Sequence, residues 1–206
     1  MAKLILIFLA VCYAIISQNA LHVSVLINIS LLVIIFMNRH NVNIVHVCAC
    51  LLAVYFIEML IFENLIMTKS ATVSQVWINA VIYSTHFAID LTLFLLLAFR
   101  VPLTRARLQK QGKPYAHIFT YNSEFALTSL FAVFMLVDLL ALVENFIRHL
   151  DELGLSAEAV QIFSNWSLVF YSYIPVKSVL LGISFLLIWS MATSIGQDKY
   201  KKGAAG

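Results

Sequence analysis

Half of the acidic residues in this sequence lie inside long apolar stretches, five of the ten in all. One histidine and one lysine accompany them there. A charge at the centre of a bilayer costs about 2.5–3.5 kcal/mol, so such side chains must face protein or water rather than lipid. The full set is Glu58, Glu63, Asp90, Asp138, Glu144, His86 and Lys177.

The positions of these residues predict a polar layer near the middle of a membrane. A rise of about 1.5 Å per helical residue, counted from the outer helix ends, places the central members about 12–24 Å deep. A layer of this kind can form a pathway for protons or small cations. The predicted members are Asn28, Glu58, His86, Asp90, Asp138 and Lys177.

The same residues also fit a purely structural role. Hydrogen bonds and neutralised ion pairs between helices fix the packing of membrane bundles without any transport. Glu63 and Glu144 lie nearer the predicted outer helix ends, where their side chains can reach the interface. The sequence favours a pathway because so many ionisable groups occur together in a short chain.

His86 and Asp90 are four residues apart and therefore share one helix face. That spacing can chelate a divalent ion, or let the carboxylate orient the imidazole. A transport site for metals would need a matching acidic pair on a second helix, and no Asp-x-x-x-Asp sequence occurs. A haem would need a pair of central histidines. We therefore expect no metal and no cofactor.

Residues 100–121 form a basic stretch, which we expect to be a cytoplasmic loop. It should set the topology and contact anionic lipid headgroups, or dock a soluble partner. The basic residues are Arg100, Arg105, Arg107, Lys110 and Lys113. The chain has no Walker motif, nucleophile elbow, His-Glu-x-x-His sequence or nucleic-acid motif, so we expect neither an enzyme nor a nucleic-acid partner.

The composition indicates the elements that must position these groups. Apolar residues make up 62% and charged residues 11% of the chain, whereas a soluble domain carries about 25% charged residues. The apolar runs are far longer than the strands of a membrane barrel, which alternate over about ten residues. The predicted fold is therefore an all-α, polytopic transmembrane helical bundle.

We expect six crossings in a single domain that spans residues 1–202. The predicted crossings are residues 4–17, 21–38, 43–67, 74–99, 123–147 and 174–193. Residues 158–173, with several aromatic side chains before Pro175, should form an interfacial or re-entrant segment. A cleaved signal peptide is the alternative for the first run. Residues 203–206 resemble an appended linker.

The basic residues predict the orientation of this six-crossing arrangement. Ten of the thirteen lysines and arginines fall on one side and two on the other, with Lys177 inside an apolar run. The positive-inside rule assigns the ten to the cytoplasm. Both termini should therefore be cytoplasmic, and we expect a multi-pass protein of a bacterial inner membrane.

The sequence thus favours a protein that passes protons or small cations, as a channel or a small transporter. Six short helices enclose little space, so a channel would require several copies, and we expect a homo-oligomer. The alternative is a non-catalytic assembly, sensor or pore-forming defence subunit of a larger membrane complex.

Overall fold

The computed structural model of the protein describes residues 20–66, 72–154, 163 and 166–193. This part of the chain contains five long helices and no strand, which confirms the all-α prediction. The helices are α2 (Ala20–Met37), α3 (Val42–Asn64), α4 (Gln75–Lys110), α5 (Asn122–Arg148) and α7 (Leu168–Ala192).

Four of these helices, α3, α4, α5 and α7, are long and apolar enough to cross a membrane, and α2 is a shorter apolar helix. A multi-pass membrane protein is therefore indicated. Six crossings are not supported by the described residues, which supply four long helices and one shorter one. The predicted first crossing, residues 4–17, lies outside the described part of the chain.

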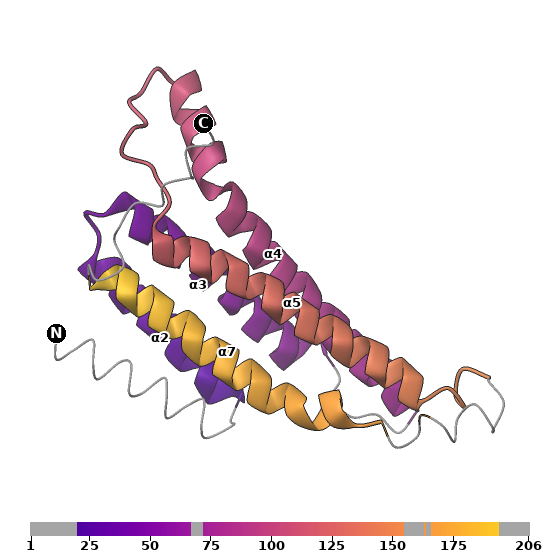
Figure 1. Cartoon of the computed structure of the whole chain (residues 1–206). Helices are drawn as coiled ribbons and strands as arrows, with labels where there is room; N and C mark the ends of the chain where they lie inside the picture. The colour runs from indigo at the N-terminus through magenta and orange to yellow at the C-terminus, as the bar shows by residue number, and fades with distance from the viewer. Residues whose placement is uncertain (1–19, 67–71, 155–162, 164–165, 194–206) are drawn as a thin grey trace.

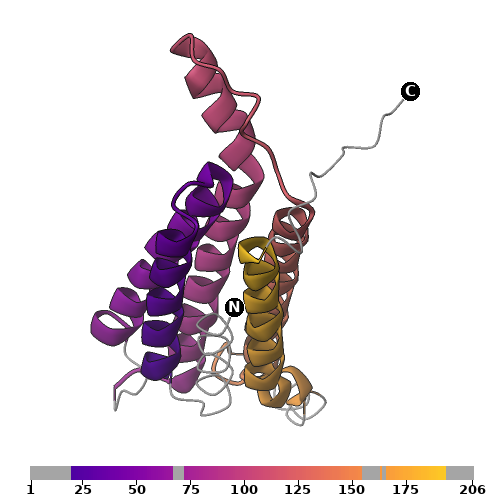
Figure 2. The same ribbon diagram turned by 90° about the vertical axis from the view of Figure 1, so that its left-hand side faces the viewer.

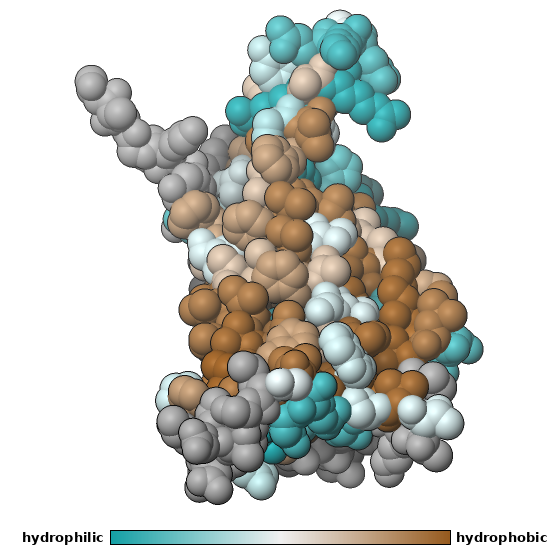
Figure 3. Space-filling model, turned by 90° about the vertical axis from the view of Figure 1, so that its right-hand side faces the viewer, coloured by the Kyte–Doolittle hydropathy of each residue, from teal (hydrophilic) through white to brown (hydrophobic). Residues whose placement is uncertain are grey.

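The helices pack side by side, with α5 between two neighbours (Figures 1 and 2). The most extensive contacts join α5 to α4, and α5 also packs along α7, while α2 packs against α3. Their shared core is apolar and includes Leu31, Leu51, Leu93, Phe131 and Met191. Figure 3 shows hydrophobic residues across the middle of one face and hydrophilic residues at its ends, the pattern of a bilayer-spanning surface.

The boundary predicted after Phe99 is wrong, because α4 continues to Lys110 as one helix of 36 residues with Pro102 inside it. Hydropathy falls after Phe99, but the arginines and lysines that follow are good helix formers. Gly112 ends the helix with a φ of +65°, and the Lys113 N–H donates to the Leu108 carbonyl across this turn. Residues 100–110, predicted as loop, are thus helical and project beyond the bundle (Figure 1).

The predicted start of the last crossing is also wrong. Helix α7 begins at Leu168 rather than residue 174, and Pro175 lies within it. Residues 168–173 therefore belong to the spanning helix and not to a re-entrant segment. The side chain of Glu144 explains this early start, because it accepts hydrogen bonds from the Val169 and Phe170 N–H groups. The residues before 163 in the expected interfacial segment lie outside the described part.

Candidate functional site

Lys177 of α7 forms ion pairs with two buried aspartates from different helices. Its Nζ lies 2.6 Å from Oδ2 of Asp90 on α4 and 2.8 Å from Oδ1 of Asp138 on α5. Asp138 is fully buried and Asp90 is 6% exposed. Three of the six residues predicted for the polar layer are therefore in direct contact.

Aromatic side chains complete the surroundings of Lys177. The Tyr173 hydroxyl donates to Asp138 Oδ1 at 2.9 Å. The ammonium group lies 4.9 Å from the ring centre of Phe134 and 5.8 Å from that of Tyr173, within the range of cation–π attraction. Tyr173 precedes Lys177 by one helical turn, and Phe134 precedes Asp138 in the same way, so the helix period aligns these groups.

A second ionisable pair, Glu58 and His86, lies beside the Lys177 cluster. His86 Nδ1 of α4 lies 3.2 Å from Glu58 Oε1 of α3. The ring of Phe62 stacks on His86, with 4.4 Å between ring centres. His86 is one turn from Asp90 on α4, which places the two polar groups next to each other.

The two groups together carry more negative than positive charge. Three carboxyl groups, those of Glu58, Asp90 and Asp138, face one lysine and one histidine. Even with His86 protonated, three ionised carboxylates would leave one uncompensated negative charge. Such a charge is costly away from water, so a bound proton or another cation is needed to neutralise it.

These groups line a pocket of about 360 Å³ to which all five described helices contribute. Glu58, His86, Asp90 and Lys177 form its polar side. Apolar side chains, including Ile27 of α2 and Leu181 of α7, make up much of the rest. The structure thus brings five of the six predicted residues into one site, four of them on the pocket wall.

Asn28, the sixth predicted residue, lies elsewhere. It lines a separate groove of about 520 Å³ between α2 and α3, together with residues such as Ile29, Leu32 and Phe56. Its Nδ2 donates to the Ser24 carbonyl at 2.8 Å. Among described residues, its Oδ1 is the buried side-chain atom without a hydrogen-bond partner. Asn28 was grouped with the cluster because of its predicted depth in the membrane. Its side chain lies on a different face of α2, so it lines a different cavity.

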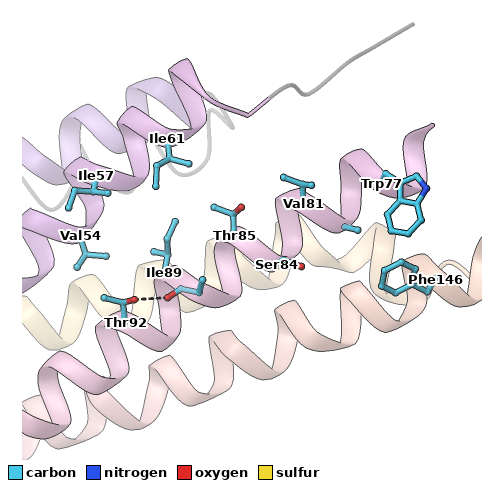
Figure 4. A pocket seen from close by; sticks show the side chains of 12 residues that line it. Val54, Ile57, Ile61, Trp77, Val81, Ser84, Thr85, Ile89, Thr92 and Phe146 are labelled. Carbon is cyan, nitrogen blue, oxygen red and sulfur yellow. Dashed lines mark hydrogen bonds between the residues drawn. The ribbon is translucent and has the colours of Figure 1, made fainter. Parts of the chain in front are cut away.

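A groove larger than the pocket at Lys177, of about 700 Å³, lies between α3 and α4 and is shown in Figure 4. Ile57 and Ile61 of α3 face Val81 and Thr85 of α4 across it. The groove is apolar apart from a few hydroxyl groups, and that of Thr92 already donates to a carbonyl of its own helix. No ionisable side chain lines it, so its size does not make it the site of the chemistry.

Arg100 was predicted to contact lipid or a partner together with the other basic residues, but the structure places it inside the bundle. It is 5% exposed, and its Nε and Nη2 donate to the two carboxylate oxygens of Glu124 at 2.6 Å. Nη2 also donates to the Phe119 carbonyl, and Nη1 to Asn43 Oδ1. This balanced ion pair ties the segment after α4 to the helices.

The four other predicted basic residues, Arg105, Arg107, Lys110 and Lys113, are exposed on the projecting end of α4 and the turn after it. Arg105 also donates from Nε to the Ile118 carbonyl at 2.7 Å, which draws the returning segment against the helix. Their contact with lipid or with a partner remains a prediction.

Glu144 has a structural role that depth along the helix did not reveal. It was expected to reach the interface, but it is 6% exposed and caps the first turn of α7. The next residue, Asn145, donates to the Val76 carbonyl and accepts from Asn79, both at the start of α4. The sequence could not have predicted these contacts, because an adjacent Glu-Asn pair does not by itself indicate a particular structure.

Within the described residues, no group of three or more histidine, cysteine, aspartate or glutamate side chains is placed to hold a metal ion. No protein-family model, no curated protein and no solved structure matches the chain. The function must therefore be argued from the site itself.

Proposed function

We propose that this protein passes protons or small cations across a membrane, and that the Lys177 cluster with Glu58 and His86 is the exchange site. The excess of carboxyl groups over cationic groups carries this proposal. A balanced set of charges would need no further ion. An unbalanced set must take up a positive charge in one state and can release it in another.

The neighbouring groups offer a short route for a proton. Glu58 and His86 are joined at 3.2 Å, and His86 lies one turn from Asp90 on the same helix. The pocket between them has room for several water molecules, since one water occupies about 30 Å³ in the liquid. Water can thus connect the two groups across distances that side chains alone do not span.

The finer membrane arrangement belongs to the same proposal. We propose six crossings in all, both termini cytoplasmic, and a bacterial inner membrane. The protein acts as a homo-oligomer or as a subunit of a membrane complex, without an enzymatic activity of its own. Its exposed basic residues near Gly112 contact anionic headgroups or a soluble partner.

Proton flux into liposomes tests the function. Purified protein is reconstituted with a pH-sensitive dye inside the vesicles, and a pH gradient or a potassium diffusion potential drives flux. We expect Asp138→Asn and Glu58→Gln to change the flux while the protein stays folded and inserted. Glu63→Gln is the matched control, because Glu63 is an exposed acid on the same helix as Glu58. Equal flux in all four proteins would contradict the proposal.

A non-catalytic subunit is the second candidate, and one observation favours it. Asp138 is buried and accepts hydrogen bonds from both Lys177 and Tyr173, which is also how a purely structural cluster is satisfied. In that case Asp138→Asn should lower thermal stability, and neither the variant nor the unchanged protein should conduct protons above empty vesicles.

A further inference from the structure

The pocket beside Glu58 is larger than proton transfer requires. Its volume of about 360 Å³ is roughly ten times the space that one water takes in the liquid. Pockets for small organic ligands have volumes of about 300–1,000 Å³, with mostly apolar walls and a few placed polar groups. The walls here fit that description, since Ile27, Phe134 and Leu181 line the pocket together with a small set of ionisable residues.

The charges in the pocket favour a cation over an anion or a neutral molecule. Lys177 is already held by Asp90 and Asp138, with distances of 2.6 and 2.8 Å. Glu58 is left with His86 as its ion-pair partner in the described part of the chain. An ionised Glu58 beside a neutral imidazole would therefore present the negative charge that is easiest to reach.

Four of the five helices around the pocket carry titratable groups that bear on the charge of Glu58. From α4 come His86 and Asp90, from α7 Lys177 and Tyr173, from α5 Asp138, and from α3 itself Tyr55. Helix α2 contributes Val23, Ser24 and Ile27, which carry no charge. The α2 side is thus an apolar wall, suited to the carbon body of a ligand whose charged end lies at Glu58.

We infer that this pocket binds a small organic cation, a protonated or quaternary amine with a short apolar body, at Glu58 in competition with a proton. The inference rests on the proposed function, because it names the class of cation that exchanges with protons there. One carboxylate cannot hold both ligands at once. Binding of the amine therefore releases one proton, and uptake of a proton expels the amine.

Phenyltrimethylammonium is a suitable probe, and tert-butylbenzene is its uncharged isostere, with carbon in place of the charged nitrogen. Full-length protein in detergent is titrated with each compound, and binding is followed by calorimetry and by proton release into weak buffer. We expect the cation alone to release protons. Its affinity should rise with pH, by at most about tenfold per pH unit, because the cation and one proton compete for the same carboxylate.

Two variants test whether loss of binding comes from the pocket itself rather than from a damaged fold. Glu58→Gln should weaken cation binding at least about tenfold and reduce its pH dependence, since the carboxylate for which the cation and the proton compete is lost. Ser178→Phe should also weaken binding, because it fills the pocket and leaves every ionisable group in place. Glu63→Gln, on the exposed side of α3, should bind like the unchanged protein.

Equal binding of the isostere, or unchanged binding in both Glu58→Gln and Ser178→Phe, would overturn the inference. So would the absence of cation binding in a protein that conducts protons in liposomes, an outcome that leaves the proposed function standing. Cation binding with proton release but without any flux would overturn the proposed function and keep the ligand site.

Discussion

Two buried groups of ion pairs in the described part of the chain differ in charge balance, and this difference distinguishes them. Arg100 and Glu124 form a one-to-one pair, and Glu124 also accepts a hydrogen bond from the Tyr121 N–H. Every charge there is matched. Lys177 instead serves both Asp90 and Asp138, which leaves one carboxyl group in excess. The first pair is neutral as it stands, whereas the second needs one further positive charge, such as a proton, to become neutral.

Replacing Lys177 should lower the free energy of unfolding, because it increases the charge imbalance in the cluster. Lys177→Met keeps the length of the side chain but leaves Asp90 and Asp138 without their shared cation. Breaking a buried pair by removing one partner costs about 3–5 kcal/mol, so we expect a loss of that size in the free energy of unfolding. Denaturation in mixed micelles measures it.

The double variant Lys177→Met, Asp138→Asn provides the control for this prediction. It removes one negative charge together with the positive one, so it should recover part of the lost stability. If Lys177→Met alone were as stable as the unchanged protein, the ion pairs would not be formed in the membrane.

At the scale of the elements, α5 is joined to α4 and α7 through three buried acids along its length. Glu124 near its start pairs with Arg100 of α4, and Asp138 in its middle pairs with Lys177 of α7. Glu144 near its end accepts hydrogen bonds from the first N–H groups of α7. A carboxylate at that position satisfies unpaired backbone donors and complements the helix dipole.

Glu144→Gln should loosen the first turn of α7 and leave the rest of the helix intact. The amide keeps one acceptor oxygen and loses the charge, and loss of a cap typically costs about 1 kcal/mol. Hydrogen exchange should become faster at residues 169–172 and stay unchanged after Pro175. The same measurement on Glu63→Gln, whose side chain is exposed, should show no change. Uniformly faster exchange along α7 would contradict a local capping role.

For the whole molecule, the length of α4 determines what lies outside the bilayer. At about 1.5 Å per residue its 36 residues extend about 54 Å, against a hydrocarbon core of about 30 Å. Its last turns and the Gly112 turn therefore project from one side, with Arg107 and Lys110 exposed at the tip (Figure 1). The basic charge is thus presented beyond the apolar part of the bundle, and the positive-inside rule predicts a cytoplasmic side for it.

Reporter insertions test this orientation. Helix α5 separates Gly112 from Asp151, and α7 separates Asp151 from Lys202. We expect a reporter at Gly112 and one after Lys202 to be cytoplasmic, and one next to Asp151 to be external. Gly112 lies in the exposed turn after α4, with open space around it, so a reporter placed there does not meet the helices. Reporters at Gly112 and Asp151 on the same side would show that α5 does not cross.

The sequence alone determined the class of the protein and most of the site. A low charge content and long apolar runs require lipid around helices, because these quantities do not depend on how the helices pack. The cost of a charge in the bilayer identified Asp90, Asp138 and Lys177 in the same way.

Only the tertiary structure decided which side chains contact each other. Packing of the helices sets the direction in which each side chain points from its helix axis, and it brings together residues that are distant in the sequence. It separated Asn28 from the cluster and buried Arg100 against Glu124, although Arg100 belongs to a basic stretch by sequence. It also placed Pro102 and Pro175 inside helices, where local propensity predicts a break. Prolines are tolerated in membrane helices where neighbouring helices compensate for the freed backbone groups, and both α4 and α7 pack along α5.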